Sequence, residues 1–264
     1  MEKWTRLCAI PFLAVALAAS TAIPLPAQSS TTSSAPAERG TEILFAAANA
    51  AGGEKLASVK SLAINEGGKL VQPQGETALN VKWLVSYPDR SHGEVTLGDQ
   101  KIFQVCDGTS AWLQFPQGTR DTTPAISEFK RGILLFGGGW GLYRQVLAGK
   151  LTGQFIGETE IEGKKTLGVA VEGPFGPLKL YFYTDTHLLA AARFQSAGEH
   201  GPTDNEQRWS DYRPVNDMPF AFSTVTYRDG AKFFESTIHN VQLNPAIDEA
   251  LFAKPQPAVP AASQ

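Results

Sequence analysis

Runs of residues with a two-residue hydrophobic period dominate this chain from about residue 61 onward. Such alternation predicts β-strands, because successive side chains of a strand point to opposite faces. Short turn signals separate the runs, among them Pro88-Asp89, Gly98-Asp99 and Asp107-Gly108. Adjacent strands are therefore expected to pair antiparallel, and the chain is predicted to be mainly β. The predicted strands are 61–71, 76–87, 90–97, 101–106, 110–115, 154–162, 164–172, 178–184, 188–196, 205–213, 219–227 and 232–242.

Two segments have helical spacing instead. Segment 38–51 is rich in Ala, Leu and Ile and stops at Gly52-Gly53, which favours one leading helix. Segment 124–149 has helical spacing on both sides of a glycine cluster and carries an apolar patch that includes Ile133, Leu134 and Phe136. We predict that this patch is a movable lid, because glycine gives the backbone the freedom to open and close. The alternative is a fixed helical pair, with glycines where a tight bend needs them.

The N-terminus has the features of a targeting segment. Lys3 and Arg6 precede an apolar run at 7–23, and Pro24 and Pro26 then break it. This order predicts a cleaved signal peptide and an exported mature protein. An uncleaved membrane anchor is the rival interpretation, but the run is short for a span and contains Pro11. The expected divisions are a signal peptide at 1–27, a flexible linker at 28–36, a folded domain at 37–255 and a disordered tail at 256–264.

Composition and motifs exclude several classes of function. The formal net charge is -3, so no basic patch is expected for nucleic-acid phosphates. The four histidines are isolated from one another, and neither a metal nor another cofactor is predicted. No nucleophile stands beside a base in a recognisable pattern, which makes a hydrolase the weakest hypothesis. The chain is therefore expected not to be an enzyme.

The hairpin "LKLYFYTDTHLLAAARFQ" pairs unequal strands. Leu178, Leu180 and Phe182 share one face of the first strand, whereas the second strand offers Ala190-Ala191-Ala192. The aromatic residue Phe194 lies on this second strand, and Phe222 lies on a further strand. A curved sheet with these residues would enclose either packed side chains or a ligand cavity, and the residues are compatible with both.

Several longer stretches resemble one family. The segments "AAGGEKLASVKSL", "DYRPVNDMPFAFSTVTY" and "NPAIDEALFAKP", together with the hairpin above and their order, resemble the outer-membrane lipoprotein-sorting (LolA/LolB-like) proteins over about 37–255. The resemblance implies a half-open antiparallel β-barrel of about eleven strands, with helices covering the concave face and an apolar cavity that takes acyl chains. The predicted ligand-binding residues are Trp83, Val85, Trp112, Leu180, Phe182, Phe194 and Phe222.

The resulting functional hypothesis is a periplasmic carrier or binding protein. Its partners would be acyl chains of lipoproteins or another amphiphilic lipid. The alternative is a non-enzymatic envelope sensor or scaffold module, which would use the same fold to bind an envelope protein.

Overall fold

The computed structural model describes residues 35–198 and 201–255, and it contains one large antiparallel sheet. The sheet has 13 strands in the order β6-β5-β4-β3-β2-β1-β13-β12-β11-β10-β9-β8-β7. Its strands are β1 (Ser61–Gln72), β2 (Gly75–Ser86), β3 (Arg90–Leu97), β4 (Gln100–Cys106), β5 (Ala111–Phe115), β6 (Gly118–Asp121), β7 (Gln154–Ile161), β8 (Lys164–Val171), β9 (Leu178–Tyr183), β10 (Leu189–Gly198), β11 (Gly201–Val215), β12 (Met218–Arg228) and β13 (Ala231–Leu243).

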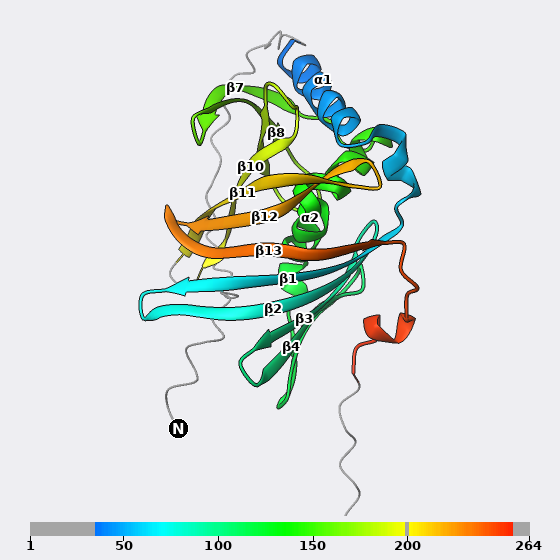
Figure 1. The fold of residues 1–264 in the computed structure, drawn as a ribbon, viewed down its shortest axis with the longest axis vertical. Helices are drawn as coiled ribbons and strands as arrows, with labels where there is room; N and C mark the ends of the chain where they lie inside the picture. Colours follow the sequence, from blue (N-terminus) through cyan, green and yellow to red (C-terminus); the bar gives the residue numbers. More distant parts are fainter. Residues whose placement is uncertain (1–34, 199–200, 256–264) are drawn as a thin grey trace, which may run out of the picture.

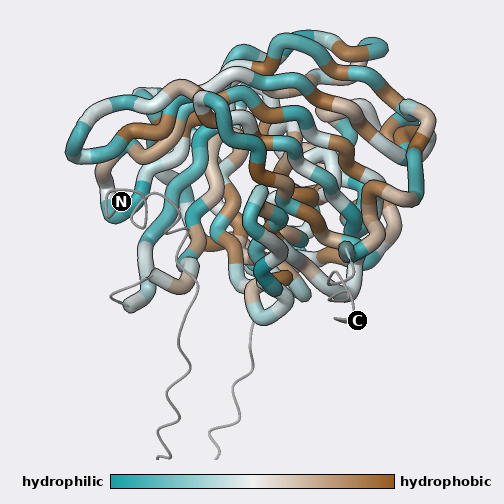
Figure 2. The backbone as a smooth tube through the Cα atoms, turned by 90° about the horizontal axis from the view of Figure 1, so that it is seen from below, coloured by the Kyte–Doolittle hydropathy of each residue, from teal (hydrophilic) through white to brown (hydrophobic). Residues whose placement is uncertain are grey.

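Two meanders make up this sheet. Strands β1 to β6 follow one another on one side and strands β7 to β13 on the other, and the pairing of β1 with β13 joins them. The outer strands β6 and β7 remain unpaired edges in the described part of the chain. Figure 2 shows that the strands form an arch, with hydrophilic and hydrophobic residues alternating along them. The prediction of a mainly β, half-open antiparallel fold is therefore confirmed.

The helices occupy one side of the arch. Helix α1 (Ala35–Ala50) packs on β7 and β8, and helix α2 (Ile126–Leu147) connects the two meanders and lies against the concave face (Figure 1). The short 3-10 helices are η1 (Gly53–Ser58), η2 (Thr123–Ala125) and η3 (Glu249–Phe252). Among the residues described, none of the helices combines the length and hydropathy needed to cross a membrane.

The hairpin of β9 and β10 shows how the concave face is filled. Leu178, Leu180 and Phe182 of β9 are buried in the main core, together with Ala192 of β10. A β-bulge between Leu189 and Ala191 shifts the register, so that Ala190 and Ala191 belong to a separate cluster on the outer face. Small residues on β10 let α2 come close to the strand. The three alanines therefore serve packing on both faces.

Some predicted boundaries change. The sheet has 13 strands, one more than the twelve segments predicted. The additional strand is β6, which is exposed along its whole length and so lacks the alternation that marks a strand. Strand β11 begins at Gly201, earlier than predicted. Helix α1 begins at Ala35, inside the segment expected to be a linker. The predicted signal peptide at 1–27, the rest of the linker and the tail at 256–264 lie outside the described residues.

Candidate ligand-binding site

Helix α2 is broken in its middle by three glycines. Phe136 is extended, and Gly137, Gly138 and Gly139 have φ values of 65°, 80° and 102°. These left-handed dihedrals suit glycine and are costly for other residues. The break separates an N-terminal half of α2 (126–135) from a C-terminal half (140–147). The glycine cluster predicted from the sequence thus bends the helix.

The C-terminal half of α2 is anchored in the main core. Trp140 is fully buried, its Nε1 donates a hydrogen bond of 2.8 Å to the Pro219 carbonyl, and its ring meets Phe220 edge to face at 4.9 Å. Leu142 and Val146 are also fully buried. Interior packing of this kind fixes side chains in single positions. This half is therefore packed firmly inside the arch.

The N-terminal half of α2 roofs a cavity of about 300 Å³. The roof consists of residues of α2, and the wall consists of side chains from both meanders. The main apolar members are Trp83, Leu113, Phe129, Ile133, Leu135, Phe136, Trp209, Phe234 and Ile238, and the polar members are Glu66, Ser91, Gln104, Glu128, Gln207, Thr224 and Ser236; Gly132 and Gly137 complete the lining. A mostly apolar cavity with a few convergent polar groups is the usual form of a small-molecule site.

Trp83 connects the wall of this cavity to its roof. The indole ring lies directly over Gly93, where an added Cβ would come within 2.3 Å of it. On the other side the ring contacts Phe136 of α2 edge to face, with centroids 5.2 Å apart. Its Nε1 donates a hydrogen bond of 2.8 Å to Glu66 Oε1. The position of Trp83 is thus fixed by one contact with each of three neighbouring elements.

Two carboxylates lie on the cavity. Burial raises the pKa of Glu66, and hydrogen bonds from Trp83 and Ser236 with the charge of His239 offset only part of the rise. Its side chain is deep within the protein, yet it keeps some accessible surface because it borders the cavity. Burial also raises the pKa of Glu128 on α2, opposed by the nearby charges of Arg131 and Arg228. Of the described residues that line the cavity, none is Lys, Arg or His.

The sequence analysis did not single out Glu66 or Glu128. For Glu66 a signal was present, because Leu62, Ile64 and Glu66 share one face of β1 by the two-residue period, and the first two are fully buried. A carboxylate that continues an inward-facing apolar row is unusual. For Glu128 we find no comparable signal, since its strand-facing position depends on where α2 crosses the sheet.

The predicted ligand residues divide into groups. Trp83 lines the cavity, as do Ile133 and Phe136 of the predicted lid. Val85, Leu180, Phe182 and Leu134 are buried in the main core beside it. Phe194 and Phe222 are partly buried against the same core and stack on guanidinium groups of Arg131 and Arg213, at 4.1 and 4.8 Å.

Trp112, predicted to bind the ligand, does not line the cavity. Its neighbour Leu113 lines the cavity, so Trp112 points to the opposite face of β5. There it is fully buried with Val105 and Phe252, the latter from η3. The cause is the C-terminal segment, which covers the outer face of β4 and β5 and creates a second core there.

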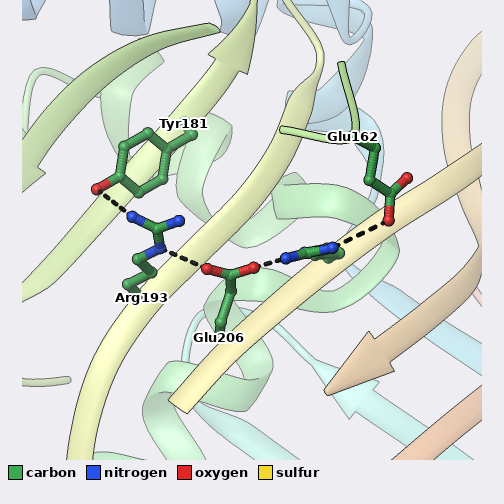
Figure 3. Close-up of polar contacts among 5 residues, drawn as sticks. Glu162, Tyr181, Arg193 and Glu206 are labelled. Carbon is green, nitrogen blue, oxygen red and sulfur yellow. Dashed lines mark hydrogen bonds and ion pairs between the residues drawn. The ribbon is translucent and has the colours of Figure 1, made fainter. Parts of the chain in front are cut away.

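A second hollow lies on the outer face of β9 to β11. It contains the ladder drawn in Figure 3, in which Glu206 accepts hydrogen bonds from Arg193 and Arg208, Arg208 also pairs with Glu162 at 3.2 Å, and Arg193 donates to the Tyr181 hydroxyl at 3.4 Å. The two guanidinium groups and two carboxylates neutralise each other. Exposed ion pairs contribute little stability, about 0 to 1 kcal/mol each. Because the four charged groups of the ladder already pair with one another, they are less available to a ligand than the polar groups of the cavity.

Metal-ligating residues do not gather within the described ranges: no three His, Cys, Asp or Glu side chains there could hold a metal ion. The residues that line the cavity offer shape, apolar contact and hydrogen bonding from Glu66 and its polar neighbours.

Comparison with known proteins identifies the fold. No protein-family model matches the chain, and no curated protein matches it in sequence. Among solved structures it is similar to a DUF1329 family protein from Desulfovibrio piger, with a TM-score of 0.57, 10% identity and coverage of 83% of this chain and 97% of that one. It is also similar to a LolA superfamily protein from Nitrosomonas europaea, with a TM-score of 0.56, 12% identity and coverage of 81% and 97%.

A third similar structure is a protein domain from Vibrio parahaemolyticus assigned to outer membrane lipoprotein sorting. Its TM-score is 0.53 at 13% identity, and the match covers 82% of this chain and 97% of that one. At these identities the similarity shows the fold alone. The chain has a LolA-like fold, as its sequence motifs predicted.

Proposed function

We propose that this protein is a periplasmic binding protein or carrier, without enzymatic activity, that holds an acyl chain of a lipoprotein or a related amphiphilic lipid. The observation that carries the proposal is the cavity of about 300 Å³ between the N-terminal half of α2 and the concave face. The LolA-like fold and the expected signal peptide support the same role. Relatives in fold include a domain assigned to lipoprotein sorting.

Apolar burial supplies the driving force for such binding. Each buried methylene contributes about 0.8 kcal/mol, so that even a chain of ten carbons offers several kcal/mol against the cost of association. Trp83 and Trp209 on the wall and Phe129 on the roof provide the complementary apolar surface.

The proposal for larger lipids requires the roof of the cavity to move. Its volume of about 300 Å³ stands at the lower end of the range for ligand pockets, roughly 300 to 1,000 Å³. A lipid with more than one chain therefore requires displacement of the N-terminal half of α2. The break at Gly137 to Gly139 allows this half to swing while the C-terminal half stays anchored. We accordingly assign the lid to the first half of α2 and the plug to the second.

A neutral acyl-site probe tests the proposal. N-phenyl-1-naphthylamine should bind the native protein with enhanced fluorescence and be displaced by compounds with a long alkyl chain. Trp83→Asp places a charge on the cavity wall and should weaken binding by about tenfold or more, since a lost apolar contact and a desolvated charge each exceed roughly 1.4 kcal/mol. The circular dichroism spectrum should stay that of the folded protein.

Ile156→Asp is the matched control. Ile156 lies on β7, is 42% exposed and is outside the cavity, so the same kind of substitution should leave probe binding unchanged. A native protein that binds neither the probe nor any alkyl compound would refute the carrier role and favour the sensor or scaffold alternative.

A further inference from the structure

The Glu66 carboxylate sits on the cavity wall with only neutral hydrogen-bond donors in direct contact. The Trp83 indole donates a hydrogen bond to it, and the neighbouring Ser236 hydroxyl group lowers its pKa. Among the described residues no Lys or Arg charge acts on it, and the one ionisable side chain that lowers its pKa is His239 of β13. A buried charge without a hydrogen-bonded counter-charge is costly, so such a carboxylate either takes up a proton or binds a cation. The cavity beside Glu66 is large enough to admit a cationic group of a ligand.

Glu128, the other carboxylate on the cavity, is in a different situation. It belongs to α2, and the charges of Arg131 and Arg228 already act on it. These two arginine charges offset part of the rise that burial causes in the pKa of Glu128. This contrast isolates Glu66 as the position on the cavity at which a ligand cation gains most.

We propose that the cavity binds an amphiphile in which a protonated amine adjoins the apolar chain, and that Glu66 accepts the hydrogen bond of this amine. The inference rests on the proposed function and names its ligand class. Fatty acids would bring a further carboxylate toward Glu66 and Glu128. An amine that carries a phosphate beside it would find no basic side chain among the described lining residues, so the ligand is a phosphate-free amine.

A series of twelve-carbon ligands tests the inference by displacement of N-phenyl-1-naphthylamine from the whole protein at neutral pH. Dodecylamine should displace the probe at a concentration about tenfold lower than dodecanol, because a hydrogen bond to a charged group exceeds a neutral one by about that factor. Dodecanoate should be the weakest of the three. A short-chain phosphatidylethanolamine should bind more weakly than dodecylamine, and tighter binding would overturn the phosphate-free assignment.

Two variants assign the preference to one carboxylate. Glu66→Gln keeps the acceptor for Trp83 but removes the charge, and should abolish the preference for dodecylamine while dodecanol binding changes less than about twofold. Glu128→Gln removes the same charge from the same cavity and should leave the preference in place.

The outcomes separate the two proposals. Equal binding of amine and alcohol to the unchanged protein would overturn the amine inference and leave the acyl-binding function standing, even if Glu66→Gln fails to fold. Loss of the preference in Glu128→Gln but not in Glu66→Gln would also overturn it. Failure of all three ligands to displace the probe would instead refute the proposed function.

Discussion

Replacement of Gly137 by alanine tests whether the break in α2 is required by its surroundings. Gly137 has φ of 65°, and a Cβ there would lie 2.2 Å from a ring carbon of Phe220. A left-handed conformation costs an alanine about 1 to 2 kcal/mol, and forcing the Phe220 ring aside costs about 1 to 3 kcal/mol. We expect Gly137→Ala to lower the free energy of unfolding by about 2 to 5 kcal/mol.

Gly132→Ala is the matched control in the same helix. Gly132 is exposed, its φ is outside the left-handed region, and an added Cβ would have no neighbour within 4 Å. Alanine at such a helical position should raise the free energy of unfolding by about 0.5 to 1 kcal/mol. Urea unfolding followed by circular dichroism measures both variants. If Gly137→Ala is as stable as the unchanged protein, or both alanines destabilise alike, the reasoning about the break is refuted.

Three further predictions address the cavity and the second core. Amides of the N-terminal half of α2 should exchange hydrogen faster than those of the C-terminal half and slow down when an alkyl ligand is added; equal, ligand-independent exchange would show that both halves are a plug. Because burial raises the pKa of Glu66 above its value in the unfolded chain, its protonated form stabilises the fold at acidic pH and this contribution is lost as pH rises. As pH rises from acidic to neutral, the free energy of unfolding of Glu66→Gln, measured by urea titration, should therefore rise relative to that of the unchanged protein. A difference that stays constant with pH would contradict a raised pKa for Glu66. Trp112→Ala should cost about 3 to 5 kcal/mol of stability in urea unfolding at constant pH without changing probe affinity in the folded protein, and a parallel loss of affinity would place Trp112 on the ligand after all.

The strand pattern and the helix break could be predicted from local sequence, because both depend on neighbouring residues. Period two specifies which residues share a face of β9 or β2, and the glycine run specifies where a helix bends. Which face becomes concave depends on residues far away. Trp112 was assigned to the wrong side because its own face of β5 is covered by η3, which follows it by more than a hundred residues.

Glu66 shows the same limit for the site. Its place in an inward row of β1 is visible in the sequence, but the row alone cannot distinguish a cavity wall from the end of a buried stretch. The cavity arises only where α2, the strands of the first meander and those of the second come together. Whether a polar residue of β1 borders a cavity therefore depends on three segments that are distant from one another in the sequence.

The junction of β1 with β13 has a consequence for how the protein is made. Leu62 pairs with Leu243, so the joint between the two meanders forms only after almost the whole chain has emerged. Until then β1 presents an unpaired edge, which is a template for association with other chains, and distant pairings of this kind fold slowly. The cavity draws Trp83 from one meander and Trp209 from the other. A chain cut short before β13 would hence have no ligand site at all, and capture of an alkyl ligand would report that synthesis and folding are complete.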